Sequence, residues 1–146
     1  MPNTKPFVQA AMICEHVLHE KDGVVSAIRV IDRITTGDVP IGLPAGVTPA
    51  VEFSILVMIK AGSIKGKSKL QVKMRRPSGA EGEVNTWPIQ LNGDEQGANI
   101  VVKASLAVSE FGLYWFDVYW NGGLLTSIPL KLVQGGVAQA LDKQSQ

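Results

Sequence analysis

Short stretches of this chain alternate apolar and polar residues with a period of two, and turn-forming residues separate the stretches at regular intervals. The clearest stretch covers residues 68–76, where Leu70, Val72 and Met74 alternate with polar side chains. Residues 100–109 repeat the pattern. Successive side chains of a strand point to opposite faces, so each stretch predicts a strand with one buried and one solvated face.

A two-residue turn at Asn121 and Gly122 separates two further apolar-rich stretches, residues 113–120 and 124–132. Asn-Gly supplies the positive φ angles that a tight hairpin turn requires, so these stretches are predicted to pair as a β-hairpin. Pro129 has no N–H to donate to a sheet, and we therefore expect the last strand at an edge.

Three more stretches complete an all-β pattern. Residues 51–59 form an apolar run that predicts a central strand, residues 24–34 follow an Asp-Gly turn, and residues 84–91 contain Trp-Pro and predict an irregular edge strand. Seven or eight strands at this spacing, with no helical pattern after residue 21, predict a single antiparallel β-sandwich of the immunoglobulin-like type. Residues 35–49, rich in proline and glycine, predict a crossover between the sheets.

The length of 146 residues fits one domain. We expect this domain to span residues 1–133 and to be followed by a polar tail over residues 134–146. The chain carries 14 basic and 13 acidic residues, a balance that favours neither nucleic acid nor an anionic membrane. A single cysteine, the lack of a secretory signal pattern and the lack of a membrane-spanning apolar run predict a cytoplasmic protein.

Residues 10–20 fit two structures. Ala10, Ile13 and Cys14 begin a stripe with helical spacing, yet the same residues can form a strand that enters the turn at Asp22. We favour the strand because the turn gives it an immediate pairing partner, the stretch at residues 24–34.

The choice between helix and strand decides whether a metal site is possible. On a strand, Cys14 and His16 share a face and His19 lies on the other, so the two histidines cannot bind one ion. On a helix, His16, His19 and Glu20 would cluster, although neither an HExxH motif nor a CxxC pair is present. We expect no metal and no cofactor. Without a nucleophile elbow or a phosphate-binding loop, we also expect no catalytic residues and no enzyme activity.

A basic segment is the most uneven feature of the charge distribution. Residues 65–76 contain six cations and no acid. Four of these cations lie on one strand face and could bind phosphates or an acidic partner: Lys67, Lys69, Lys73 and Arg75. Alternatively, they protect an exposed strand from aggregation, or they are neutralised by Glu81, Glu83, Asp94 and Glu95. No aromatic residue is interleaved with them, so a base-stacking platform is not expected.

Large rings occupy both faces of residues 113–120. Only one face can line the core, and we expect the second set, Trp115 and Tyr119 with Leu113, to be covered by a loop, by the tail or by another chain. Leu56 and Met58, on the outer face of the predicted central strand, raise the same question.

The segment from Ser109 to Val133 has a Gly-x-Tyr strand entry, an aromatic-rich strand, a glycine turn and a final strand with a proline. With residues 11–34 near the start, it resembles an uncharacterised bacterial family, a domain of unknown function built as one antiparallel sandwich. The segment before Tyr114 also resembles the tyrosine corner of immunoglobulin domains, in which the tyrosine hydroxyl bonds back to the preceding backbone. The resemblance implies the fold and supplies no catalytic or cofactor residues.

We therefore expect a non-enzymatic protein-interaction module that acts through a sheet face or an edge strand, with a protein partner or by self-association. The alternative function is binding of an anionic ligand or nucleic acid through the face from Lys67 to Arg75, and nucleic acid is the less favoured of these. The candidate binding residues are Lys67, Lys69, Lys73, Arg75, Trp115 and Tyr119.

Overall fold

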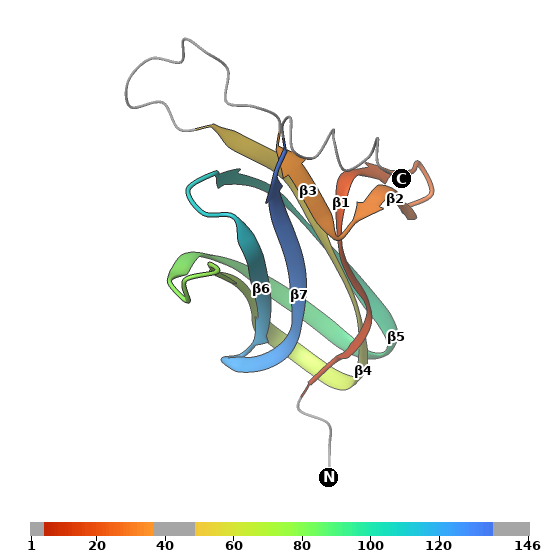
Figure 1. The fold of residues 1–146 in the computed structure, drawn as a ribbon. Coiled ribbons are helices and arrows are strands. Elements are labelled where there is room, and N and C mark those ends of the chain that lie inside the picture. Colours follow the sequence, from red (N-terminus) through yellow and green to blue (C-terminus); the bar gives the residue numbers. More distant parts are fainter. Residues whose placement is uncertain (1–4, 37–48, 136–146) are drawn as a thin grey trace.

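The structure is a computed structural model that describes residues 5–36 and 49–135, apart from the side chains of residues 83, 84, 94 and 95. In this part of the chain all regular structure is β-strand, which confirms the predicted all-β class (Figure 1). No helix long and apolar enough to cross a membrane occurs in these ranges. The strands are β1 Phe7–His19, β2 Val25–Ile31, β3 Arg33–Thr36, β4 Ala50–Arg75, β5 Glu81–Ala107, β6 Gly112–Trp120 and β7 Gly123–Gln134.

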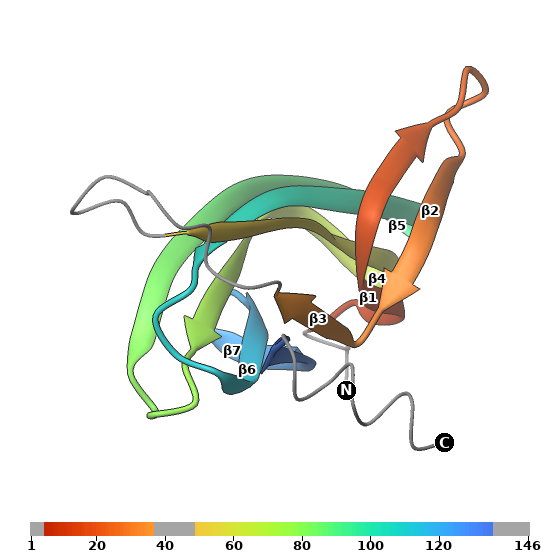
Figure 2. The same ribbon diagram turned by 45° about the horizontal axis from the view of Figure 1, so that its top comes forward.

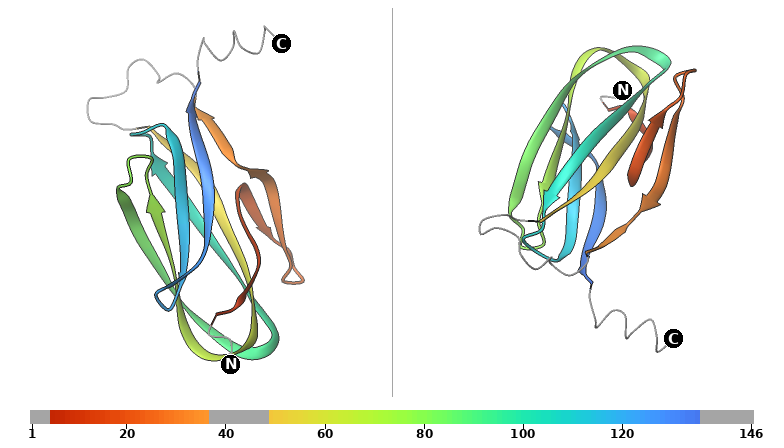
Figure 3. Two further views of the ribbon diagram at one scale, coloured as in Figure 1. Left: turned by 60° about the horizontal axis from the view of Figure 1, so that its bottom comes forward. Right: turned by 90° about the horizontal axis from the view of Figure 1, so that it is seen from above.

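β4 and β5 form one long antiparallel hairpin that is folded double, with the bends of both strands at the same end of the molecule (Figure 3). The register of the pair shifts on either side of Gly62, which has a φ of +60°. A Cβ atom at this position would lie 2.7 Å from the ring of Phe7. Glycine therefore permits both the bend and the close contact, and each strand contributes one arm to each of two layers.

The two layers are halves of one hydrogen-bonded sheet, with the order β2-β1-β4-β6-β7-β3 and with β5 on the other side of β4. The first arm of β4 pairs with β1, and the second arm pairs with β6. Every pair is antiparallel except β3 with β7, which is parallel. The structure therefore differs from the predicted antiparallel sandwich in two respects: the two layers belong to one continuous sheet, and one pair of strands is parallel. Figure 2 shows that the β1–β2 hairpin leans away from the rest of the molecule.

One apolar core lies between the layers, and both arms of the doubled hairpin contribute to it. Phe53 from the first arm of β4 and Phe116 from β6 meet edge to face, with ring centroids 5.5 Å apart. The first arm of β4 is not hydrogen-bonded to β6, which pairs only with the second arm, so this contact links the two layers through side-chain packing. The largest fully buried side chains include Tyr114, Ile13, Ile55, Ile59, Leu70, Leu91, Leu130 and Leu132.

The strand boundaries differ from the expected ones in three places. Residues 51–59 and 68–75 belong to one strand, β4, and residues 84–91 and 100–107 likewise belong to one strand, β5. The stretch at residues 24–34 is instead divided at Asp32 into β2 and β3, which pair with different partners. Bulges allow one strand to turn a corner without ending, and a period-two pattern does not reveal this.

Two local predictions in the C-terminal part of the chain are confirmed. Asn121 and Gly122 have φ angles of +47° and +85° and connect β6 to β7 as a two-residue turn. The Tyr114 hydroxyl donates a 2.7 Å hydrogen bond to the carbonyl oxygen of Glu110, which is the expected tyrosine corner. The prediction that the last strand lies at an edge is only partly correct. β3 pairs with residues 131–134 of β7 and is the outer strand, whereas the part of β7 around Pro129 pairs only with β6 among the described strands.

The residues near the N-terminus form a strand, as favoured over the helix: β1 pairs with β2 through the Asp22-Gly23 turn. The predicted crossover at residues 35–49 and the polar tail from residue 134 lie almost entirely outside the described residues.

Candidate functional site

The four predicted cations of the basic segment lie on the second arm of β4 and point away from the core. Leu70 and Val72 between them are buried in the core, with 0% and 4% of their surface exposed. Lys67, Lys69 and Arg75 are exposed, and Lys73 is half-buried. The expected single face is therefore present in the structure.

The aromatic strand lies directly beside these cations. β6 pairs with the second arm of β4, so that Arg75 is opposite Trp115 and Gln71 is opposite Tyr119. The alternate residues of β6, from Tyr114 to Trp120, face the core. The two candidate sets that the sequence suggested separately thus form a single surface. We call Lys67, Lys69, Lys73, Arg75, Trp115 and Tyr119 the basic–aromatic face.

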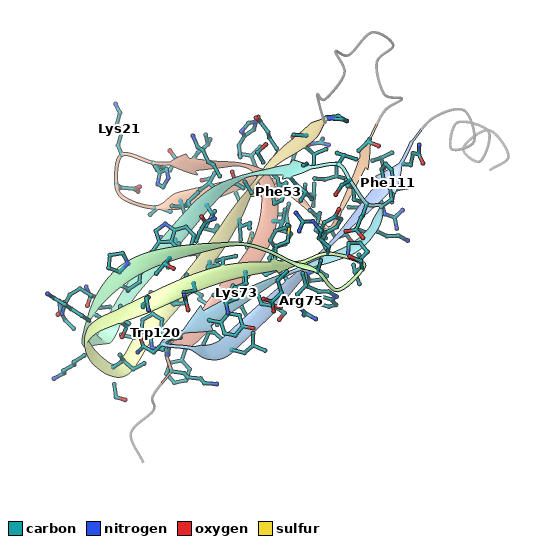
Figure 4. The ribbon with its side chains drawn as sticks, turned by 90° about the vertical axis from the view of Figure 1, so that its left-hand side faces the viewer. Lys21, Phe53, Lys73, Arg75, Phe111 and Trp120 are labelled. Atoms are coloured by element: carbon teal, nitrogen blue, oxygen red, sulfur yellow. The ribbon has the colours of Figure 1, made fainter. Side chains whose placement is uncertain are left out.

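Two of the cations stack on the two rings. The Lys73 ammonium nitrogen lies 4.8 Å from the centroid of the Tyr119 ring, and the Arg75 guanidinium carbon lies 5.6 Å from that of Trp115. Both distances are within the range of cation–π attraction. Figure 4 shows Lys73 and Arg75 next to each other on β4. The cations partly cover the rings, which are half-buried, while Leu113 keeps 43% of its surface exposed.

Sequence inspection finds no aromatic residue within the basic segment, and it therefore argues against a stacking platform. That argument is incomplete, because the neighbouring strand β6 supplies rings beside Lys73 and Arg75. Sequence separation hides the arrangement: the two strands lie more than forty residues apart along the chain. Their pairing depends on the fold of the whole domain.

A buried carboxylate holds the face together. Asp117 lies between Trp115 and Tyr119 on β6, and its side chain is 6% exposed. Arg75 donates two hydrogen bonds to it, from Nε at 2.6 Å and from Nη2 at 2.9 Å. The Ser127 hydroxyl on β7 donates a third, at 2.6 Å. Such a bidentate pair fixes the plane of the guanidinium and so its position over the Trp115 ring.

These hydrogen bonds lower the pKa of Asp117. The bonds from Arg75 make the largest contribution; burial opposes them, and the Ser127 hydroxyl adds to them. The sequence reasoning missed Asp117, although it left a signal: it is the only carboxylate in the otherwise apolar and aromatic strand Gly112–Trp120. A lone acid among core residues requires a partner, since burying an unpaired charge is costly.

The possible neutralising acids near the basic segment are only partly described. Glu81 is the Cα partner of Arg75 across the β4–β5 pair. The side chains of residues 83, 94 and 95 lie outside the described part. The partner that the structure does give to Arg75 is Asp117, from the other side of β4.

The residues considered above for a metal site, Cys14, His16 and His19, lie on β1, away from the basic–aromatic face. The strand geometry puts Cys14 and His16 on one face and His19 on the other. Within residues 5–36 and 49–135, no group of three or more His, Cys, Asp or Glu side chains is arranged to hold a metal ion. Cys14 is fully buried, and this burial raises the pKa of its thiol. Glu15 forms an ion pair with Arg29, with 2.8 Å between the charged atoms.

Leu56 is buried, with 2% of its surface exposed, although it is not part of the core between the layers. It is paired with Met12 of β1 on one side and with Val101 of β5 on the other. Met58, its neighbour on the same face, is half-buried. The outer face of the first layer therefore has an apolar centre around Leu56.

Comparison with known proteins gives one family and several distant structures. The model of a family of unknown function, DUF6941, matches residues 9–133. This match confirms the resemblance to an uncharacterised family. No curated protein matches this chain in sequence.

Three of the solved structures that are similar to this chain are each 12% identical to it in sequence. The CARDB domain of a Pyrococcus furiosus protein, in complex with di-metal ions, is covered over 100% of its length and 91% of this chain, with a TM-score of 0.42. The match to an immunoglobulin-like protein of Pseudomonas aeruginosa covers 88% of this chain and 97% of that protein, with a TM-score of 0.43. The match to a β-glucosidase of Listeria innocua covers 73% of this chain and 15% of the glucosidase, with a TM-score of 0.45.

Proposed function

The chain belongs to the DUF6941 family of unknown function, and we propose that it is a non-enzymatic interaction module that binds an acidic surface of a partner protein. The observation that carries this proposal is the basic–aromatic face, where cations and large rings share one rigid patch of sheet. Trp, Tyr and Arg are the residues that contribute most to binding in protein interfaces. The neighbouring lysines make the patch positive and suit it to acidic partners.

Rigidity is the property that distinguishes this face from a row of solvated lysines. Arg75 is held by two hydrogen bonds from its guanidinium to Asp117, and Asp117 is held in turn by Ser127. A side chain that is already ordered loses less conformational entropy when a partner binds. The exposed Lys67 and Lys69 extend the positive charge along β4 and would increase the association rate.

An acidic protein suits the face better than a nucleic acid. Base stacking requires the open face of a ring, and here Lys73 and Arg75 lie over the rings of Tyr119 and Trp115. Carboxylates of a partner can bind Lys67, Lys69 and the exposed part of Arg75 without displacing these stacked cations. Self-association through this face would bring like charges together, so we propose a different chain as the partner.

Affinity capture from the native cell lysate tests the proposal with matched variants. Lys69→Glu reverses one charge on the face, and Trp115→Leu removes one ring. Lys21→Glu makes the same change of net charge in the β1–β2 turn, at a point distant from Lys73 and Arg75 (Figure 4). We expect wild type and Lys21→Glu to retain the same acidic protein, at a level that decreases with salt, and the two face variants to lose it.

Two outcomes would contradict the proposal. Equal recovery of the partner by all four proteins would mean that binding occurs elsewhere on the molecule. Loss of the captured material after nuclease treatment would identify nucleic acid as the ligand of this face. Light scattering of each purified variant at several concentrations checks that a lost partner is not explained by a change in self-association.

A further inference from the structure

β5 has an unpaired edge in both layers. Within residues 5–36 and 49–135 it pairs only with β4, so the backbone groups on its other side have no strand partner. Exposed edges of this kind pair readily with other chains, and natural proteins usually protect them with proline, charge or bulges. The two arms of β5 differ in this protection.

The arm near residue 88 is blocked by proline. Lys69, the Cα partner of Pro88, uses both backbone groups on Asn121: its N–H donates to Oδ1 and its carbonyl accepts from the backbone N–H, each at 2.9 Å. The Lys69–Pro88 pair is therefore one of the pairs without mutual hydrogen bonds. The missing N–H of Pro88 consequently lies on the outer edge, where it would otherwise have been available to an added strand.

The arm before residue 108 has no such block. The N–H of Val108 donates to the carbonyl of Pro49 at 2.8 Å, which fixes the alternation of the hydrogen bonds between β4 and β5. Val101, Lys103 and Ser105 therefore direct their N–H and C=O groups away from β4. Lys103 and Ser105 also have exposed side chains. This segment is an open row of donors and acceptors with one charge at its centre.

A cleft with an apolar floor and a polar rim lies along the same edge. It has a volume of about 370 Å³ and is lined by core residues of both layers, among them Phe53, Phe116, Val102 and Leu106, and by the polar residues Arg76, Asn85, Lys103 and Ser105. The side chains of Val102 and Leu106 come from the open arm itself and face the core. A strand added beside this arm would direct every second side chain into the cleft.

We propose that the open edge of β5 from Val101 to Ser105 binds an extended segment of another protein as an added strand. The segment has apolar residues at alternate positions, which fill the cleft, and an acidic residue opposite Lys103. Main-chain pairing supplies affinity in such complexes and the alternate pockets supply specificity. A second copy of this chain is disfavoured, because pairing of arm with arm would bring two Lys103 side chains together. This site is separate from the basic–aromatic face and does not depend on it.

A defined peptide tests the proposal. The probe is a short fluorescein-labelled peptide that alternates valine with polar residues and carries a central glutamate, and the control peptide has lysine in its place. Binding is followed by fluorescence anisotropy. We expect the glutamate peptide to bind more tightly than the lysine peptide to wild type, and Lys103→Glu to reverse that preference.

Ser105→Pro removes one outward N–H, as Pro88 does on the other arm, and Ser105→Ala keeps it. We expect the proline variant to bind the glutamate peptide about tenfold more weakly than the alanine variant. Hydrogen exchange on unmodified protein adds a measurement that needs no variant: the peptide should slow exchange at Val101, Lys103 and Ser105 and leave Thr86 unchanged.

Three results would overturn the proposal. The first is equal affinity of the Ser105→Pro and Ser105→Ala proteins for the peptide, if both are folded by circular dichroism. The second is no slowing of exchange along the open arm at saturating peptide. The third is a concentration-dependent dimer of wild type that Ser105→Pro dissociates, since this would make a second copy the occupant of the edge.

Discussion

Replacing Asp117 by asparagine tests how the basic–aromatic face is held together. The substitution keeps the size of the side chain and removes its charge. The carboxylate accepts three hydrogen bonds, two of them from Arg75. An asparagine can accept with its oxygen only, and its NH₂ group would then face a donor. We expect Asp117→Asn to fold and to lose both stability and the fixed orientation of Arg75.

The size of the loss follows from the exposure of the two partners. A hydrogen bond to a charged group contributes about 1.5–3 kcal/mol. The Arg75 side chain is 46% exposed, so solvent screening places the value near the lower end of that range. We expect a decrease of about 2 kcal/mol in the free energy of unfolding at pH 7, or roughly 6–8 °C in Tm for a domain of this size.

The pH dependence gives the sharper measurement. The folded-state pKa of Asp117 is lowered, so the stabilisation is present above the unfolded pKa of about 3.9 and is lost as the pH falls through the folded pKa. The difference in stability between wild type and Asp117→Asn should therefore be largest near neutral pH and should decrease on acidification. Urea unfolding at a series of pH values, followed by tryptophan fluorescence, measures this difference.

A double-mutant cycle with Arg75→Met assigns the effect to the ion pair. Asp117→Asn should cost much less stability when Arg75 is already methionine, and this coupling should diminish at acidic pH. Two results would refute the reasoning: a stability difference that does not change between pH 7 and pH 3, or single-variant losses that simply add in the double variant.

Other predictions concern the buried groups and the turns. Tyr114→Phe should reduce the free energy of unfolding by about 1 kcal/mol, because the hydrogen bond to the Glu110 carbonyl is lost and no cavity is created. Urea unfolding measures this difference. An unchanged midpoint would show that the tyrosine corner does not stabilise the fold. Cys14 should react with a thiol reagent at neutral pH far more slowly in the folded than in the urea-unfolded protein, because it is buried and its thiol pKa is raised. Equal labelling rates in the two states would contradict the described packing. Asn121→Ala should cost about 1–2 kcal/mol, since alanine tolerates the positive φ less well and cannot accept from the Lys69 N–H. Hydrogen exchange at Lys69 should increase in the same variant, and no increase would argue against the side-chain bond.

The features predictable from the sequence are those that depend on neighbours along the chain. The alternation around Leu70 and the Asn121-Gly122 turn each determine local structure through nearby backbone geometry. The tyrosine corner is equally local, because Tyr114 bonds to a residue four positions earlier. The strand at residues 10–20 was predictable for the same reason, since its hairpin partner follows directly.

The features that could not be predicted depend on which distant strands become neighbours. Nothing in the alternation around Leu70 shows that Trp115 will lie beside Arg75, because that neighbour comes from β6, more than forty residues further along the chain. The parallel pairing of β3 with β7 is hidden in the same way. The bend at Gly62 could not be predicted either, because a glycine within a polar stretch is equally typical of the end of a strand.

The doubled hairpin has a consequence for how this domain can come apart. Two layers built from separate strands can slide or separate when the packing between them weakens. Here β4 and β5 each contribute an arm to both layers. One layer therefore cannot unfold without disrupting strands that also belong to the other layer. We expect the described part of the chain to melt in one cooperative step. A partner that binds to either arm would then stabilise the whole domain against unfolding, because neither layer unfolds independently of the other.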